Sequence, residues 1–337
     1  MANLCDYFAN KGEQVFLIND IIPEKGKLEY CVSNEVTRYF LDQGKLSGLK
    51  KNWHRIHRLR KLILNEKPDV IISFMGPPNI RMLVSTIGLN VKKIVSVRND
   101  PYKEYGTGIK SLVAKIIFLL ADGCVFQTSE AREYFFESTQ KNSRIIFNPV
   151  NPKFYEHTWN GKGKDIVVIG RLQAQKNPLL ALDAFIKIAD DYPETNLLFF
   201  GDEELKEEIL LKAKEKNLSK RVLIMGKTDR VEDVLENAAI YVLSSDYEGM
   251  PNALMEAMAV GVPVISTDCP CGGPRALIRN KEQGLLVPCR DIAGMEAAMR
   301  TLLDNKELCR KMSKAEQERA KNFTPELVLA NWEDFIE

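Results

Sequence analysis

The stretch SSDYEGMPNALMEAMAVGVPVISTD, residues 244–268, decides how this chain folds. Two carboxylates, Glu248 and Glu256, are separated by seven residues, and a Gly-Met-Pro-Asn turn that opens a helix lies between them. Pro251 fits the first helical turn, where a missing N–H is no loss. The Gly-Val-Pro-Val-Ile-Ser run that follows is typical of a buried strand. The stretch therefore predicts a helix followed by a strand, the unit from which parallel sheets are built.

The start of this predicted helix is an expected anion site. The backbone N–H groups at 249–254 face outward from the helix start and favour negative charge. Glu248 comes before the helix, and Glu256 lies about one and a half turns along it, so two carboxylates flank the site. A phosphate site beside carboxylates that can accept hydrogen bonds from hydroxyls suits a sugar nucleotide. The alternative is an ordinary surface helix with two solvated glutamates.

The rest of the chain predicts two domains. Strand-like runs alternate with helical stretches throughout, which favours parallel sheets. The predicted strands are 14–18, 70–74, 93–97, 123–127, 144–147, 165–170, 196–201, 222–225, 240–243, 263–267 and 284–287. A length of 337 residues fits two domains, and two prolines within 148–152 break any element there. We expect an α/β fold with Rossmann-like domains at 1–150 and 151–320, and a final helix at 321–337 that packs on the first domain.

Composition narrows the class of protein. No run of 18 apolar residues occurs, so no spanning helix is predicted, and the apolar stretch 109–120 is expected to be a packed helix. The N-terminus lacks a signal-peptide pattern, and seven scattered cysteines indicate reduced thiols, so we expect a cytoplasmic protein. Cys269 and Cys271 form the closest pair, and no second pair is spaced to complete a zinc site.

The charge is unevenly distributed. Residues 1–150 carry 22 Lys and Arg against 15 Asp and Glu, whereas the rest carries 25 against 31. A basic N-terminal half indicates an anionic partner. Nucleic acid is not expected, because no nucleic-acid-binding motif is present and the sequence pI is about 7.5.

Residues 45–67 form a basic amphipathic segment with one acid, Glu66. Leu49, Trp53, Ile56, Leu59 and Ile63 follow a spacing of three and four, which places them on one helix face. The cations of this segment are Lys45, Lys50, Lys51, Arg55, Arg58, Arg60, Lys61 and Lys67. Such a helix suits an anionic membrane surface, and the alternative is an apolar face turned to the core with a solvated back.

The stretch 244–268 resembles the donor site of retaining glycosyltransferases of family 4, which have the GT-B architecture. The resemblance covers nearly the whole chain, most tightly from 144 to 290. It implies two Rossmann-like domains with parallel sheets facing across a cleft. It also implies a metal-independent enzyme that moves a hexose or N-acetylhexosamine from a nucleotide-diphosphate sugar, with retained configuration. We expect a UDP-sugar donor and a lipid-linked glycan acceptor, in polysaccharide or cell-surface glycan synthesis on the inner face of the plasma membrane.

The diphosphate site is expected where one strand ends and the next helix begins. Gly170 and Arg171 end a predicted strand, and Lys176 precedes a helix. Arg offers a fork for phosphate oxygens, and Lys supplies a point charge. In the family, an Arg and a Lys at these positions bind the donor diphosphate, so we assign Arg171, Lys176 and Glu248 to catalysis, with Glu248 facing the transferred sugar. The alternative for the two cations is a solvated pair at a strand end.

Further donor contacts follow from the resemblance. Glu256 matches the family residue that accepts hydrogen bonds from the ribose hydroxyls. The remaining donor-side positions, which act mainly through backbone groups, are Gly170, Gly226, Lys227, Gly249, Met250, Asn252 and Ala253. No Asp-x-Asp with a supporting metal constellation occurs, so we expect no metal and no cofactor beyond the donor substrate.

The acceptor side offers two candidates, Arg98 and Asp100, at the end of a predicted strand. Arg98 can hold a phosphate, and Asp100 can orient an acceptor hydroxyl. Some relatives place a His at this strand end. The alternative for the Asn-Asp-Pro sequence is a plain turn.

Three rival functions stay open. Relatives open with a strand and a Gly-rich loop before a helix like 2–11, and both are absent here, so we expect the N-terminal domain to lack its first strand. That feature favours a non-catalytic sugar-nucleotide-binding protein or a truncated, inactive transferase. A sugar-nucleotide epimerase would need acid and base side chains that the sequence does not show, and a phosphorylase would need a longer chain.

Overall fold

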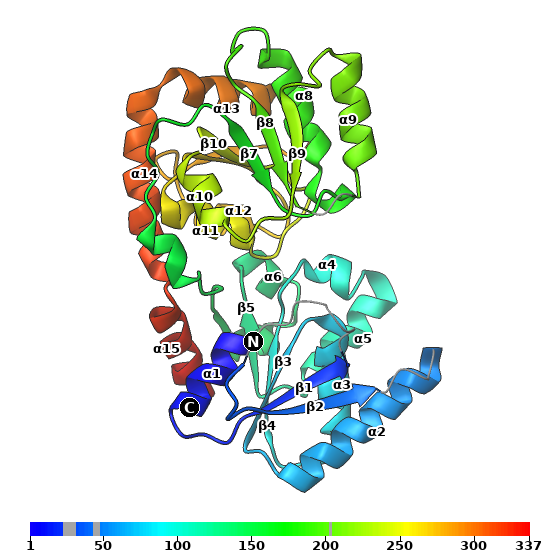
Figure 1. The fold of residues 1–337 in the computed structure, drawn as a ribbon. Helices are drawn as coiled ribbons and strands as arrows, with labels where there is room; N and C mark the ends of the chain where they lie inside the picture. Colours follow the sequence, from blue (N-terminus) through cyan, green and yellow to red (C-terminus); the bar gives the residue numbers. More distant parts are fainter. Residues whose placement is uncertain (23–31, 43–47, 202–203) are drawn as a thin grey trace. The chain divides into compact units, whose positions relative to one another are not determined.

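The computed structural model describes residues 1–22, 32–42, 48–201 and 204–337 (Figure 1). These residues form two compact units. The first consists of Met1–Phe126, Arg132–Ile146 and Leu329–Glu337, and the second of Gln127–Ala131 and Phe147–Val328.

The first unit is built on parallel strands. In it, β3 (Val70–Phe74), β4 (Lys92–Ser96), β5 (Gly123–Phe126) and β6 (Ser143–Ile145) pair in chain order. A separate parallel pair joins β1 (Phe16–Ile21) to β2 (Thr37–Asp42). Ile94 and Val95 of β4 are fully buried, as is usual for parallel strands covered by helices on both faces.

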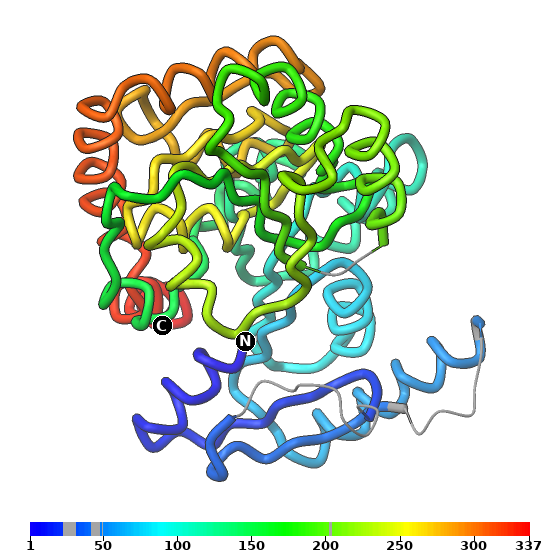
Figure 2. The backbone as a smooth tube through the Cα atoms, turned by 45° about the horizontal axis from the view of Figure 1, so that its top comes forward, coloured from blue at the N-terminus to red at the C-terminus, as the bar shows by residue number. Residues whose placement is uncertain are grey.

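Helices flank these strands, and the end of the chain joins them. The helices are α1 (Ala2–Asn10), α2 (Gly48–Glu66), α3 (Gly76–Ser85), α4 (Pro101–Glu104), α5 (Gly108–Phe118) and α7 (Glu137–Lys141), and α6 (Ser129–Glu133) is divided between the two units after Ala131. Figure 2 shows α2 running alongside β2. From α15 (Pro325–Ile336), Trp332 packs on Phe74 with ring centroids 5.5 Å apart, and Glu333 pairs with Lys11 at 2.5 Å.

The second unit holds a six-stranded parallel sheet in the order β12-β11-β10-β7-β8-β9. Its strands are β7 (Ile166–Ile169), β8 (Leu197–Phe200), β9 (Val222–Gly226), β10 (Ile240–Leu243), β11 (Val264–Thr267) and β12 (Leu285–Val287). The chain builds the sheet outward from β7, first through β8 and β9 and then from β10 to β12. This is the doubly wound arrangement, and its order reverses between β7 and β10.

Helices cover both faces of this sheet. They are η1 (Pro152–Glu156), η2 (Ala174–Lys176), α8 (Pro178–Ile188), α9 (Lys206–Glu215), α10 (Val231–Glu236), α11 (Asn252–Val260), α12 (Gly273–Leu277), α13 (Ile292–Asp304), α14 (Lys306–Ala320) and η3 (Lys321–Phe323). One core joins α8, α9 and α13 to the sheet, and a second joins α10 and α11 to it. In α11, Leu254, Met255 and Met258 are fully buried, so packing fixes this helix in place.

One prediction about the first unit is only partly confirmed. The apolar stretch 109–120 was expected to be a packed helix, but α5 exposes its apolar side and buries Ser111, Ala114 and Phe118 instead. Small side chains allow α5 to approach its neighbours, which leaves the larger residues in contact with solvent. Across the described residues, no helix combines the length and the apolar character needed to cross a bilayer.

Candidate active site

Most of the predicted donor residues follow β7 and β10, which pair where the strand order reverses, whereas Gly226 and Lys227 lie at the end of β9. Ligands of open α/β sheets bind outside the carboxyl ends of the strands at such a point. The segment Gly170–Lys176 follows β7, and the segment Ser244–Pro251 follows β10. The two sets of residues that the sequence predicted separately therefore meet at one edge of the sheet.

Hydrogen bonds fasten these two segments together. The Asp246 amide donates to the Gln175 carbonyl at 2.9 Å, and the Gln175 side chain donates to the Tyr247 carbonyl at 3.0 Å. The Asn177 side chain donates to the Asp246 carboxylate at 3.0 Å. These contacts fix the position of Lys176 relative to the turn before α11.

Lys176 and Glu248 form an ion pair at the centre of the site. The Lys176 ammonium lies 2.5 Å from Glu248 Oε1, and the Ser245 hydroxyl donates to the same oxygen at 2.6 Å. Glu248 is only 5% exposed, and a carboxylate so buried needs such partners. A ligand phosphate arriving here would compete with Glu248 for the ammonium. This pairing was not visible in the sequence.

The start of α11 offers backbone donors. The Leu254 and Met255 amides donate to the Pro251 carbonyl at 3.1 and 3.2 Å. The amides of Asn252 and Ala253 precede this ladder and have no acceptor within the helix. The sequence predicted Pro251 in the first helical turn. The helix begins one residue later, at Asn252, so Pro251 is its N-cap.

The turn before α11 is held by the segment after β11. The Glu248 amide donates to the Pro270 carbonyl at 2.7 Å, and the Cys271 amide donates to the Glu248 carbonyl at 3.1 Å. A Cβ added to Gly273 would lie 1.9 Å from the Gly249 carbonyl oxygen. Only glycine therefore fits at 273, and the turn that carries Gly249 and Met250 rests directly on its backbone.

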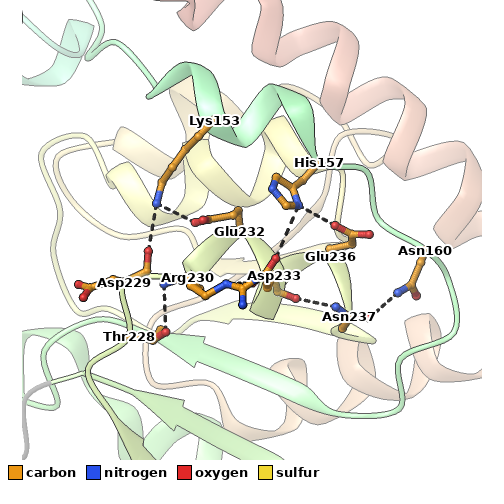
Figure 3. Close-up of polar contacts among 10 residues, drawn as sticks. All are labelled: Lys153, His157, Asn160, Thr228, Asp229, Arg230, Glu232, Asp233, Glu236 and Asn237. Atoms are coloured by element: carbon orange, nitrogen blue, oxygen red, sulfur yellow. Dashed lines mark hydrogen bonds and ion pairs between the residues drawn. The ribbon is translucent and has the colours of Figure 1, made fainter.

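Glu256 is a partly buried carboxyl group in α11. Burial raises its pKa to about 7, the Lys153 ammonium lowers it, and the Glu232 carboxylate raises it. Figure 3 shows Lys153, from η1, between the Asp229 carbonyl and the Glu232 carboxylate. The Lys153 to Glu232 distance is 2.7 Å. Glu256 can thus exchange a proton near neutral pH, which the sequence alone did not indicate.

Glycines lie at the carboxyl ends of three neighbouring strands: Gly170 after β7, Gly201 after β8 and Gly226 at the end of β9. A Cβ on Gly201 would lie 1.8 Å from the Gly170 carbonyl oxygen, and the Gly201 amide donates to the Gly226 carbonyl at 2.9 Å. Gly226 has a φ of +72°, which favours glycine. Arg171 and Lys227 follow these strands with exposed side chains.

Tyr241 is a buried polar side chain near the two glutamates that the sequence did not single out. It is fully buried in β10, and its hydroxyl has no hydrogen-bond partner among the described residues. Burial, followed by the charges of Glu248 and Glu256, raises its pKa well above the usual value. In the sequence, Tyr241 belongs to a run of core residues, so no signal separates it from an ordinary strand side chain.

The two acceptor-side candidates lie in the first unit. Arg98 stacks on the rings of Phe74 and Trp332, at 4.8 and 5.5 Å from their centroids, and burial lowers its pKa to about 10. Asp100 is the N-cap of α4 and accepts from the Tyr102 amide at 2.9 Å. This hydrogen bond supports the alternative that the Asn-Asp-Pro sequence is a turn.

Several side chains of the basic segment 45–67 pack or form ion pairs within the first unit. Leu59 and Ile63 are buried, whereas Trp53 is 64% exposed. The Arg55 guanidinium pairs with Asp20 at 3.1 Å. Lys45 and the side chain of Leu49 lie outside the described residues. Contact of this segment with a membrane stays a prediction.

Among the described residues, His157, Asp233 and Glu236 bring potential metal-ligand atoms within 4.8 Å of one another. His157 Nδ1 lies 2.7 Å from a Glu236 oxygen, and Arg230 pairs with Asp233 (Figure 3). Ion pairing between α10 and the residues around it accounts for these contacts.

Comparisons with known proteins agree with this fold. The family described as "Glycosyl transferases group 1" matches residues 151–319. The "UDP-Gal:alpha-D-GlcNAc-diphosphoundecaprenol alpha-1,3-galactosyltransferase" of Escherichia coli is 32% identical over 317 residues, 87% of this chain and 81% of that protein. The "GalNAc-alpha-(1->4)-GalNAc-alpha-(1->3)-diNAcBac-PP-undecaprenol alpha-1,4-N-acetyl-D-galactosaminyltransferase" of Campylobacter jejuni is 26% identical over 316 residues, 91% and 86% of the two chains.

A solved structure extends the comparison to the whole chain. The sucrose-phosphate synthase of Thermosynechococcus elongatus superposes with a TM-score of 0.82 at 18% identity, covering 99% of this chain and 90% of that one. The fold is thus that of a GT-B glycosyltransferase, with two Rossmann-like domains. The chain belongs to the glycosyl transferases group 1 family, which confirms the predicted resemblance. Its relatives include the two transferases above, whose names contain undecaprenol-linked sugars, and a Vi polysaccharide biosynthesis protein of Salmonella typhi.

Proposed function

We propose that this chain moves a hexose or N-acetylhexosamine from a UDP-sugar to a hydroxyl of a lipid-linked glycan, with retained anomeric configuration. The observation that carries the proposal is the buried ion pair of Lys176 and Glu248 beside the start of α11. The names of the Escherichia coli and Campylobacter jejuni relatives, both of which contain undecaprenol, support a lipid-linked acceptor. The first of these names also supports a UDP-sugar.

The reaction breaks the anomeric C–O bond of the donor, which leaves an oxocarbenium-like sugar and a diphosphate. Lys176 and Arg171 would stabilise the negative charge that grows on the diphosphate, together with the amides of Asn252 and Ala253. Because these cations supply the charge that a divalent ion would otherwise supply, we propose that the reaction needs no metal. Glu248 would face the sugar once the diphosphate engages Lys176.

Retention requires a way to place the acceptor on the face that the leaving group vacates. We propose attack on that same face, with a diphosphate oxygen accepting the proton of the acceptor hydroxyl. Glu256 would hold the ribose hydroxyls meanwhile, and Gly226 and Lys227 would lie beside the base. Exclusion of water during this step would limit hydrolysis of the donor.

A lipid-linked acceptor places the enzyme at the inner face of a membrane. The excess of cations in residues 1–150 supports binding of an acceptor that carries phosphate. Arg98, which is partly buried against aromatic rings, is our candidate for that contact.

The test is turnover of the full chain with a panel of UDP- and GDP-sugars and an undecaprenyl-diphosphate-linked saccharide. We expect transfer from a UDP-sugar, an axial-to-axial relation between donor and product by NMR, and no loss of activity in EDTA. Lys176→Met should abolish turnover, whereas Lys187→Met, an exposed lysine of α8, should not. Donor binding without hydrolysis or transfer would point instead to a sugar-nucleotide-binding protein. An inverted product would refute retention, and EDTA sensitivity reversed by Mg²⁺ would refute metal independence.

A further inference from the structure

Helix α5 of the first unit turns its apolar face outward. The exposed fractions range from 42% for Leu120 to 82% for Ile109. The residues of this apolar stripe are Ile109, Leu112, Val113, Ile116, Leu119 and Leu120. Their spacing of three and four residues places all of them along one side of the helix and its last turn. They form a continuous surface rather than scattered exposed residues.

The opposite side of α5 explains why the stripe is free. Ser111, Ala114 and Phe118 are buried there, and α5 packs beside α3 through that side. The helix is thus anchored by this side, and turning the large residues of the stripe inward would expose Phe118 to solvent. The exposed stripe therefore needs another partner to leave water.

The size of the stripe helps to identify that partner. From the exposed fractions, it covers roughly 600 Å², which is at the upper end of the largest apolar patches on monomeric proteins. A stable dimer buries about 800 Å² on each partner, with flat complementary surroundings. One narrow helical ridge falls short of that area, whereas a bilayer interface accommodates a ridge of any outline.

The charge around the stripe favours an anionic surface. Lys110 is exposed on α5 itself, and Lys115, also on α5, places its ammonium 4.6 Å from the Tyr134 ring centroid. Residues 105–121 contain no Asp or Glu. A helix with large apolar residues on one side and lysines flanking them is the pattern that lies in the headgroup region of anionic membranes.

We propose that α5 is the membrane-docking helix of this protein and that Ile109, Val113 and Ile116 enter the acyl boundary of an anionic bilayer. The proposal rests on the proposed function, because a lipid-linked acceptor brings the enzyme to a bilayer. It assigns the main contact to α5 rather than to residues 45–67, where Leu59 and Ile63 are already buried in the protein.

The test is binding of the purified full chain to vesicles of phosphatidylcholine with about one-third phosphatidylglycerol, followed by co-sedimentation. The double variant Ile109→Ser with Ile116→Ser should bind at least about tenfold more weakly. Leu211→Ser is the matched control, since Leu211 is 59% exposed on α9 of the second unit, and Trp53→Ser tests the basic segment. Both should bind nearly as well as the unchanged chain. The substituted side chains are exposed, so all of these variants should stay folded, which circular dichroism checks.

Several outcomes would overturn the proposal. If the double variant binds vesicles as well as the unchanged chain, α5 is not the docking helix. If Leu211→Ser weakens vesicle binding as much as the double variant does, the binding is general apolar adhesion. Equal binding to pure phosphatidylcholine would refute the role of charge. A lipid-free dimer that only the double variant dissociates would assign the stripe to a second copy. Vesicle binding does not require turnover, so a chain that docks through α5 but transfers no sugar would refute the proposed function alone.

Discussion

Affinity for the donor should rise about tenfold between about pH 6 and about pH 8, because Glu256 has to lose a proton before its carboxylate can accept two ribose hydrogen bonds. The pKa of Glu256 is raised to about 7 in the free protein, with burial as the main cause. A bound ribose stabilises the ionised form, so binding and deprotonation are linked. Donor binding should therefore release a proton below about pH 7.

The size of the effect follows from the fraction ionised. At about pH 6, roughly one-tenth of a group with a pKa of about 7 is ionised, and at about pH 8 roughly nine-tenths is. Stability should move in the opposite direction. The folded pKa exceeds the ordinary value of 4.5, so the free energy of unfolding should fall as pH rises from 4.5 to about 7. The total loss is about 3 kcal/mol at most.

The assay is calorimetry with an unreacted UDP-sugar at several pH values and in buffers of different ionisation enthalpy. A UDP-sugar is preferable to UDP, because the terminal phosphate of UDP titrates near pH 6 and would mimic the expected slope. Glu256→Gln is the matched control, since it keeps the shape of the side chain and removes the proton. Its affinity should be weaker at about pH 8 and independent of pH.

A flat pH profile for the unchanged chain, or an equal slope in Glu256→Gln, would refute the assignment of Glu256 to the ribose. Lys153→Met provides a second check, because loss of that ammonium should raise the pKa of Glu256 further and shift the profile to higher pH. A shift to lower pH would contradict the electrostatic account.

Three other substitutions test the site and its support. Lys176→Met should leave Glu248 buried with one hydrogen bond, lower stability to urea by about 2 kcal/mol, and reduce kcat more than donor affinity; unchanged kcat would exclude Lys176 from the reaction. Gly273→Ala should displace the Gly249 carbonyl, which a new Cβ would approach to 1.9 Å, and weaken donor binding at least about tenfold; unchanged binding would show that the turn can move freely. Glu316→Gln should remove a buried carboxyl group whose pKa is well above 4.5, so the fall in stability between 4.5 and neutral pH should become shallower in thermal unfolding; an equal or steeper fall would contradict the burial argument.

Residues near strand ends were predictable from the sequence, but their contacts were not. Strand and turn patterns placed Lys176 after one strand and Glu248 after another. Their ion pair forms because β7 and β10 are neighbours in the sheet. The order of the strands is not encoded in either local segment, so the sequence pattern could not predict this contact. Tyr241 illustrates the same limit, because burial beside two carboxylates is a tertiary property.

Helix α5 shows a different limit. The apolar stretch 109–120 was predicted to be a packed helix, and the helix is there, with its large apolar residues along one side. The pattern could not say whether that side faces the protein, because Ser111 and Ala114 are acceptable on either side of a helix. Asp100 was open to two interpretations for a similar reason: the same carboxylate can cap a helix or orient a ligand.

The division of the chain has a consequence for its synthesis. Most of the first unit, Met1–Phe126, is synthesised before the second unit, but Leu329–Glu337 is synthesised after it. In this last segment, Trp332 contacts Phe74 and Glu333 pairs with Lys11. A growing chain cannot supply Leu329–Glu337 until the whole second unit has been synthesised. The second unit, which is complete at Val328, is therefore expected to fold first, and Met1–Phe126 stays without these partners until they have been made. Protease sensitivity of chains stalled before and after residue 329 would reveal this order, and early protection of the first unit would contradict it.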